Sequence, residues 1–211
     1  MYDPPRTPDS PPRRIASMTN PPLRLTGNTE ADRLLTEDDN ALLLAMVLDQ
    51  QVPMEKAFSG PLVIAQRMGG RLDVAAIAAT SEEDFVALCS RPPAIHRFPA
   101  AMAKRVRQLC QVLTEDYDGQ AANIWKDARS GEEVKANLER LPGFGADKAA
   151  IFTAVLGKLR DIRPDGWRTA AGYYGEQGTF RSVADIVDSD SLQKVRETKK
   201  SVKAAKKEMS G

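Results

Sequence analysis

The chain has 211 residues and a formal net charge of +1, and its composition is 42% hydrophobic but only 6% aromatic. This length suits one domain with a buried core. The near-neutral charge excludes whole-chain attraction to nucleic acid, so such a partner would need a local basic patch. With two cysteines and one histidine, the chain cannot build a four-cysteine iron–sulfur cluster or a recognisable zinc site.

The two ends of the sequence differ in composition from the middle. Residues 1–23 are rich in proline and lack hydrophobic periodicity, which predicts a disordered leader. This leader lacks the apolar segment of a signal peptide, and no run of about 18 apolar residues follows that would span a membrane. Residues 191–211 carry many Lys and Arg side chains and are expected to form a basic tail or helix.

Between residues 24 and 190 we predict an all-α domain, because Ala and Leu dominate and apolar residues recur at helical spacing. Pro53 ends the first expected helix, and Thr80 with Glu83 and Ser130 with Glu133 form capping-box patterns. The expected helices cover residues 38–48, 54–68, 80–90, 119–128, 134–140 and 146–158, with a long helix that begins at Pro99 and short helical turns at 73–78 and 180–187.

A five-residue turn, Leu141-Pro142-Gly143-Phe144-Gly145, joins two of the predicted helices. Pro142 fixes its own φ and has no N–H, while Gly143 and Gly145 can take positive φ and leave the backbone accessible. The amides of the turn and of the following helix N-terminus can then point at one anion, such as a DNA phosphate. Such a contact positions a protein on DNA without reading its sequence. The alternative is an ordinary turn between two packed helices.

At this turn the sequence resembles the helix-hairpin-helix DNA glycosylase superfamily, in its endonuclease III and adenine-glycosylase group. The similar stretch runs from Asn40 to Gly166. The resemblance implies a two-lobed, all-α glycosylase fold that lacks an iron–sulfur cluster. It places Gln50, with Gln51 beside it, at the DNA interface next to a flipped nucleotide. Two polar residues that merely end a helix are the alternative interpretation of this pair.

The resemblance also implies a catalytic aspartate at Asp165, which follows the hairpin at the spacing of the family. A turn residue within Pro-Asp-Gly is the alternative. Bifunctional members carry a lysine two residues after the second hairpin glycine, where this chain has Asp147, and Lys148 comes one residue later. Since one helical residue corresponds to about 100° of rotation, Lys148 is expected to point elsewhere. This favours an enzyme without lyase activity.

The remaining candidate residues would contact a flipped base or the DNA backbone. Aromatic rings can stack on an extruded base, and the residues expected to line a base pocket are Asp49, Trp167, Tyr173 and Tyr174. Lysine and arginine neutralise phosphates, and the residues expected to do so are Lys104, Arg105 and Lys148. A solvated helix face is the alternative for these basic residues. No metal ligand is identified, and the resemblance allows only a monovalent cation at the hairpin.

These features predict a monofunctional DNA glycosylase of base excision repair, which cleaves the N-glycosidic bond of a damaged or mismatched base in double-stranded DNA. A carboxylate near the anomeric carbon would stabilise positive charge and orient the attacking water. A non-catalytic helix-hairpin-helix DNA-binding protein and a bifunctional glycosylase/lyase that uses Lys148 are the alternatives. We expect a monomer in a reducing, bacterial-type cytoplasm, associated with the nucleoid when bound to DNA.

Overall fold

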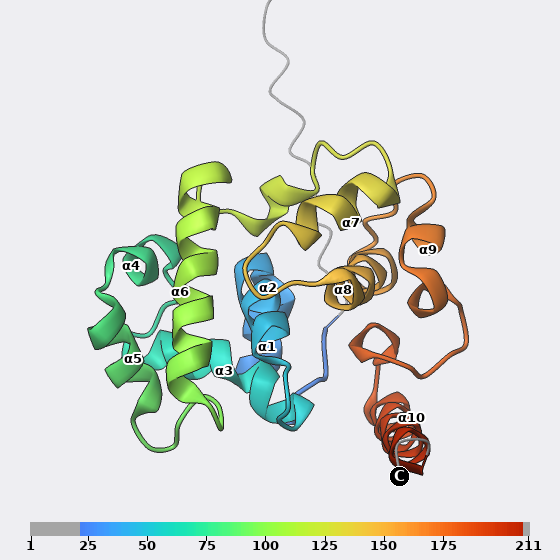
Figure 1. The fold of residues 1–211 in the computed structure, drawn as a ribbon, viewed down its shortest axis with the longest axis horizontal. Helices are drawn as coiled ribbons and strands as arrows, with labels where there is room; N and C mark the ends of the chain where they lie inside the picture. The colour runs from blue at the N-terminus through green and yellow to red at the C-terminus, as the bar shows by residue number, and fades with distance from the viewer. Residues whose placement is uncertain (1–21, 209–211) are drawn as a thin grey trace, which may run out of the picture.

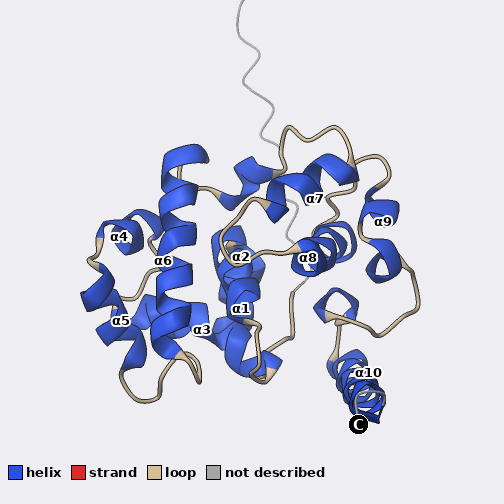
Figure 2. Ribbon diagram, viewed as in Figure 1, coloured by secondary structure: helices blue, strands red, loops and turns tan. Residues whose placement is uncertain are grey.

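The computed structural model describes residues 22–208, and this part of the chain is helical with no β-strand (Figure 1, Figure 2). The prediction of an all-α fold is therefore confirmed for these residues. The α-helices are α1 (Thr29–Glu37), α2 (Asp39–Leu48), α3 (Met54–Arg67), α4 (Val74–Ala79), α5 (Glu82–Ser90), α6 (Pro99–Asp116), α7 (Gly131–Glu139), α8 (Ala146–Leu159), α9 (Trp167–Ala170) and α10 (Ser189–Glu208). Short 3-10 helices are η1 (Ala121–Ile124), η2 (Gly172–Gly175) and η3 (Val183–Asp185).

Helix α2 forms the centre of the fold. Its residues from Ala41 to Leu48 are all buried, and a helix that is apolar on every side must be surrounded by other elements. It packs against α1, α3, α6 and η1. The Asp38 side chain accepts hydrogen bonds from the amides of Asn40 and Ala41 and so caps the N-terminus of α2.

Two groups of helices flank the centre. Helices α4 and α5 pack against α6 on one side, and α7, α9, η2 and η3 pack against α8 on the other. Figure 1 shows these groups at the left and the right, with α1 and α2 between them. Helix α10 contacts η3 and lies at the lower right, below the second group (Figure 1).

Several predicted helix boundaries are confirmed, and one predicted helix is wrong. Helix α2 ends at Leu48, α6 begins at Pro99, and α8 covers the predicted residues 146–158. The segment 119–128 forms only η1, because Gly119 takes a φ of 71° and the chain turns there. Trp125 packs on Phe152 of α8 with ring centroids 5.8 Å apart, so a tertiary contact fixes this segment.

Of the two predicted capping boxes, the one at Thr80 is not formed, and the one at Ser130 is formed in part. Ser81, rather than Thr80, caps α5, and Thr80 is the C-terminal cap of α4. At α7 the Ser130 hydroxyl accepts a hydrogen bond from the Glu133 amide at 3.2 Å. The Glu133 carboxylate accepts one from the Arg129 amide at 2.8 Å. The helix starts are thus predictable to within a residue or so, while the partners of the capping groups are not.

Leu23, the last residue of the predicted leader, belongs to the packed part of the described chain. The leader prediction falls almost wholly on residues 1–21, which lie outside the described residues. Leu23 is 4% exposed, and its amide donates to the Thr36 hydroxyl at 2.9 Å. Helix α1 is not among the predicted elements, although its N-cap, Asn28, is a favoured capping residue. The basic C-terminal segment, predicted as a tail or helix, lies within α10 as far as Glu208.

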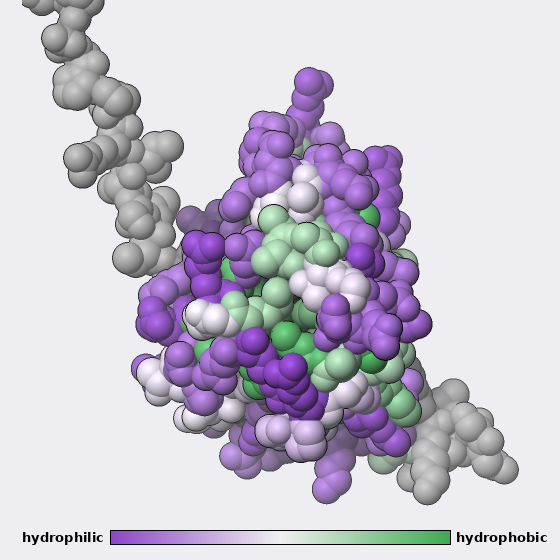
Figure 3. Space-filling model, turned by 90° about the vertical axis from the view of Figure 1, so that its left-hand side faces the viewer, coloured by the Kyte–Doolittle hydropathy of each residue, from purple (hydrophilic) through white to green (hydrophobic). Residues whose placement is uncertain are grey.

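Helices α4 and α5 lie on the face of the molecule that Figure 3 shows. That face carries a weakly hydrophobic area within hydrophilic surroundings (Figure 3), and the exposed residues of α4 are alanines. The large exposed apolar residues of the described chain are Phe98, Tyr173, Val187 and Val202. None of the helices between residues 22 and 208 combines the length and apolar character that crossing a membrane requires.

Candidate nucleic-acid interface and adjoining cavity

The hairpin between α7 and α8 is anchored by two apolar side chains. Leu141 and Phe144 are 3% and 8% exposed, and the Phe144 ring packs edge-on against Phe152 at 5.9 Å. Gly143 and Gly145 are exposed between and after them. Gly145 is the N-cap of α8 and makes no side-chain capping bond, so the first amides of α8 are available to a ligand.

Gly143 brings the hairpin against the end of α2. Its φ is +84°, and a Cβ added there would lie 3.2 Å from Val47 Cγ1 and 3.9 Å from Arg105 Cδ. A side chain at this position would therefore be strained by its backbone and crowded by Val47. The glycine thus permits a close approach between the hairpin and the C-terminal end of α2.

Gln50 and Arg105 meet beside this approach. The Arg105 guanidinium donates a hydrogen bond from Nη1 to Gln50 Oε1. Gln50 is half-buried just after α2, and its own amide donates to the Leu48 carbonyl at 2.7 Å. The side-chain amide nitrogen of Gln50 remains a donor toward the surface. The pairing joins the segment after α2 to α6.

Lys148 points to the same place from α8. Its Nζ donates to the carbonyl oxygens of Met46 at 2.9 Å and Val47 at 3.0 Å. A cation at this position compensates the negative end of the α2 dipole. Burial lowers the pKa of Lys148 to about 8, nearby Asp49 opposes that shift, and Arg105 adds to it.

The structure therefore brings together residues from three distant stretches of sequence. Gln50, Arg105, Gly143 and Lys148 all surround the C-terminal end of α2. The helical rotation expected for Lys148 agrees with its position, since it faces α2 while Asp147 lines a separate cavity. Lys148 is committed to two carbonyls here, and one of its three hydrogen-bond donors is left for another partner.

A cavity of about 680 Å³ adjoins this site between α8, η2 and α10. Asp49 and Tyr173, both expected in a base pocket, line it. The hydroxyl of Tyr173 donates to that of Tyr174 at 2.7 Å, and Tyr174 donates to Asp147 Oδ1 at 3.1 Å. The two rings lie with centroids 4.1 Å apart and are tilted by 35° to each other. The cavity thus offers an aromatic wall together with two carboxylates.

The phenol of Tyr174 stays protonated. Burial raises the pKa of Tyr174, as do its hydrogen bond with Tyr173 and the nearby Asp147 carboxylate. Tyr174, like Tyr173, is a residue expected to line the pocket, whereas Asp147 is not among the predicted site residues, although it occupies the position of the family's lysine. That position is the signal by which Asp147 is recognisable in the sequence.

Helix α10 forms the outer wall of the cavity. Lys199 Nζ lies 3.8 Å from Asp49 Oδ2, and Arg196 pairs with Glu55 of α3. Val202, which is 50% exposed, and Lys203 also line the cavity from α10. The basic C-terminal segment thus lies over the candidate site as an ordered wall.

Two predicted site residues lie elsewhere. Trp167 is 5% exposed, and its ring fills the space over Gly157, where an added Cβ would lie 2.4 Å from the indole. It therefore packs against α8 and does not line the cavity that holds Asp49. Asp165 is exposed in the loop before α9, and its carbonyl accepts a hydrogen bond from the Gly131 amide at 2.8 Å. It is likewise not a lining residue of that cavity.

Lys104 and Gln51, which are also predicted to contact DNA, have different neighbours from the residues at the C-terminal end of α2. Lys104 forms an ion pair with Glu82 of α5 at 2.8 Å, on the side of α6 that faces α5. Gln51 is exposed and takes a left-handed backbone with φ of 56°. It lines a second cavity, of about 490 Å³, with Arg97 and Lys203. Gln51 therefore adjoins two cations that belong to different elements.

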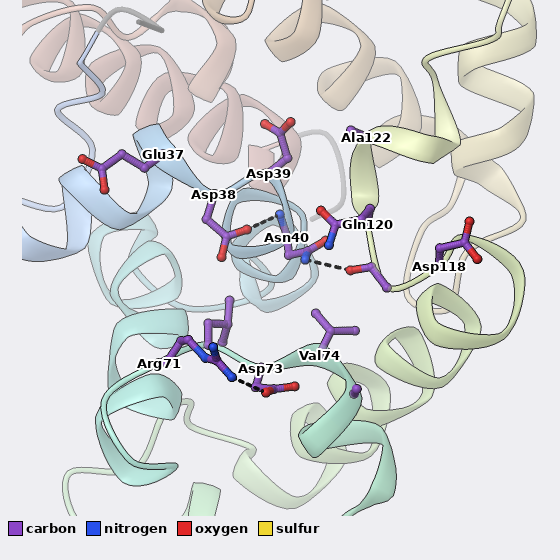
Figure 4. A pocket seen from close by; sticks show the side chains of 13 residues that line it. Glu37, Asp38, Asp39, Asn40, Arg71, Asp73, Val74, Asp118, Gln120 and Ala122 are labelled. Atoms are coloured by element: carbon purple, nitrogen blue, oxygen red, sulfur yellow. Dashed lines mark hydrogen bonds and ion pairs between the residues drawn. The ribbon is translucent and has the colours of Figure 1, made fainter. Parts of the chain in front are cut away.

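An acidic cavity of about 530 Å³ lies at the other end of α2 (Figure 4). Burial raises the pKa of Asp38 and of Asp39, and both line this cavity with Asp73 and Asp118. Arg71 pairs with Asp73 at 2.9 Å. The N-terminal end of α2 thus faces mainly carboxylates, whereas Arg105 and Lys148 lie beside Asp49 at its C-terminal end.

The described residues include no group of three or more His, Cys, Asp or Glu placed to hold a metal ion, and Cys89 and Cys110 are buried free thiols. Burial raises the pKa of the Cys89 thiol to about 12 and raises that of Cys110 as well. Comparisons of the chain with protein-family models, with curated proteins and with solved structures gave no match.

Proposed function

We propose that this protein binds double-stranded DNA through its hairpin and excises a damaged or mismatched base, as a monofunctional DNA glycosylase with a two-lobed helix-hairpin-helix fold. One observation carries the proposal. Gln50, Arg105, Gly143 and Lys148 converge at one end of α2, beside a cavity of about 680 Å³ that holds two tyrosine rings and two carboxylates.

The hairpin would bind a phosphate of the DNA backbone. Leu141 and Phe144 fix the turn in the core, which leaves Gly143, Gly145 and the first amides of α8 at the surface. These donors and the positive end of the α8 dipole suit an anion. Arg105, with Arg97 and Lys203 nearby on the second cavity, adds the positive charge that DNA binding requires.

Gln50 would fill the space left by an extruded nucleotide, and the base would enter the cavity beside it. Extrusion costs a few kcal/mol, and stacking on Tyr173 would offset part of that cost. In the hydrolysis, a water oxygen bonds to the anomeric carbon while the bond to the base nitrogen breaks. The base leaves with that electron pair and gains a proton, and a carboxylate takes the proton of the water.

The family resemblance and the geometry of the structure point to different residues as this carboxylate. The resemblance implies Asp165, whereas Asp49 and Asp147 line the cavity. The test is single-turnover base release from duplexes with uracil, alkylated purines, 8-oxoguanine or mismatches. We expect release from at least one of these, and a loss of about 100-fold or more in the Asn variant of the responsible aspartate. No release from any duplex, or full activity in all three variants, would contradict the proposal.

A second candidate function is DNA binding without chemistry, and one observation favours it. Asp165 is exposed and lies outside the lining of the cavity that holds Asp49. This candidate predicts that the protein binds duplexes in a salt-dependent way and releases no base. The same base-release measurement therefore decides between the two functions.

A lyase that uses Lys148 is the remaining candidate. Its lowered pKa, about 8, is favourable for an amine nucleophile, but its Nζ is bonded to the carbonyls of Met46 and Val47. Borohydride trapping on an abasic duplex tests it, with Lys148→Met as the control. A trapped adduct that depends on Lys148 would assign lyase activity to the protein.

A further inference from the structure

His96, the one histidine of the chain, is buried beside the candidate interface, with 1% of its surface exposed. It lies in the loop between α5 and α6. The Phe98 amide donates a hydrogen bond to its Nδ1 at 3.0 Å, and its Nε2 lies 2.8 Å from the Gln50 carbonyl oxygen. A backbone amide can only donate, so Nδ1 carries no proton, and Nε2–H is the donor to Gln50.

These two bonds connect the segment after α2 to the start of α6. Phe98 is the N-cap of α6, and Arg105 of the same helix binds the Gln50 side chain. Gln50 is thus held twice, by its backbone through His96 and by its side chain through Arg105. The next residue, Gln51, has a left-handed backbone, a conformation that persists only when its surroundings fix it.

The charged groups that act most strongly on the imidazole are cations. They are Lys56 of α3, Arg97 of its own loop and Lys148 of α8, and each of them disfavours a charged imidazole. Burial lowers the pKa of His96 most, and only the bond to the Gln50 carbonyl acts in the opposite direction. The neutral ring with its proton on Nε2 is therefore the form that persists near neutral pH.

We propose that His96 is a positioning residue that holds Gln50 in place for DNA, and that a second proton on the imidazole removes its bond with the Phe98 amide and displaces the loop through which it holds Gln50. The part of this inference that concerns DNA rests on the proposed function. A proton on Nδ1 would face the Phe98 amide, and two donors cannot share a hydrogen bond. The loop must then move, and with it Arg97, whose guanidinium lies 4.8 Å from the Phe98 ring centre.

Two substitutions of His96 each keep one of the two hydrogen bonds of the imidazole and remove the other. His96→Gln places an amide N–H near the position of Nε2, so it keeps a donor for Gln50 without a titrating group. His96→Asn places a carbonyl near the position of Nδ1, so it keeps an acceptor for Phe98 and loses the donor for Gln50. We expect the Gln variant to bind DNA at neutral pH as the unmodified protein does, and the Asn variant to bind about tenfold more weakly.

The experiment is a pH titration of the full chain by NMR, in which the one histidine gives one imidazole signal pattern. We expect the Nε2–H tautomer at neutral pH, and a side-chain amide signal of Gln50, identified by its loss in Gln50→Ala, that shifts at the same pH as the ring. An Nδ1–H tautomer, or a Gln50 signal that does not follow the ring, would overturn the proposal even if neither His96 variant folds.

Affinity for a duplex over the same pH range completes the test. We expect the unmodified protein to lose about tenfold in affinity as the ring is protonated, and His96→Gln to keep its neutral-pH affinity. An equal acidic loss in His96→Gln would overturn the role of the imidazole in DNA binding. If the unmodified protein binds no duplex at any pH, the proposed function fails, and the Gln50 signal alone decides the role of His96.

Discussion

The two glycines of the hairpin have different surroundings, so a substitution at one is expected to affect stability and a substitution at the other to affect DNA binding. Gly143 has φ of +84° and lies close to Val47, whereas Gly145 has φ of −121° and no neighbour within 4 Å of an added Cβ. We expect Gly143→Ala to lower the free energy of unfolding by about 1–2 kcal/mol. Gly145→Ala should leave stability within about 0.5 kcal/mol but weaken DNA binding, because its methyl group occupies the open space in front of α8. Denaturant unfolding and duplex titration measure both effects, and equal destabilisation by the two variants would contradict this assignment.

Lys148 gives the protein a stability that depends on pH. Its pKa falls from 10.5 to about 8 on folding, so between these values the unfolded chain binds more protons than the folded chain. The contribution of this group to the free energy of unfolding therefore rises as pH increases from about 8 to 10.5. We expect the stability of the unmodified protein, measured relative to Lys148→Met by denaturant unfolding, to increase across this window. A difference that stays constant would show that the amine titrates normally in the folded chain.

The place of a residue in the structure can be predicted from the sequence where the local sequence alone determines the backbone conformation. The hairpin matches its prediction because proline, two glycines and two apolar anchors determine a turn at that place. The side chains of Lys148 and Asp147 point in different directions, as the rotation between neighbouring helical residues requires. Asp165 is placed in the site by its spacing from the hairpin, and Trp167 by its aromatic ring. The direction of the chain after α8 is, however, set by left-handed backbone at Asp161 and Gly166, and by the space above Gly157 that the indole of Trp167 fills. The number of residues between the hairpin and a later residue does not show that the chain changes direction between them.

At the scale of elements, α10 covers a cavity while few contacts hold it. Its ion pairs with other described parts of the chain are Arg196 with Glu55 and Lys199 with Asp49, and Arg196 is more than half exposed, so such a pair contributes about 0.5 kcal/mol. We expect Glu55→Gln to speed amide hydrogen exchange in α10 about twofold without changing exchange in α2. Glu82→Gln, which removes the Lys104 partner on α5, is the matched control and should leave α10 unchanged. Equal exchange in both variants would show that the Glu55 pair does not hold the helix.

Over the whole molecule, the two ends of α2 differ in charge, because the cavity at its N-terminal end is lined by four aspartates, whereas Arg105 and Lys148 lie beside Asp49 at its C-terminal end. DNA should therefore approach from the C-terminal end, where Arg97 and Lys203 flank Gln51. Arg97→Ala is expected to lower the salt dependence of duplex affinity by about one unit of slope, the contribution of one phosphate contact. Lys104→Ala removes the same charge from α6 where it faces Glu82, and it should leave the slope unchanged. Affinities measured over a series of salt concentrations provide both slopes. If the two variants change the slope equally, the interface extends over α6, and the polarity of α2 does not determine how DNA is bound.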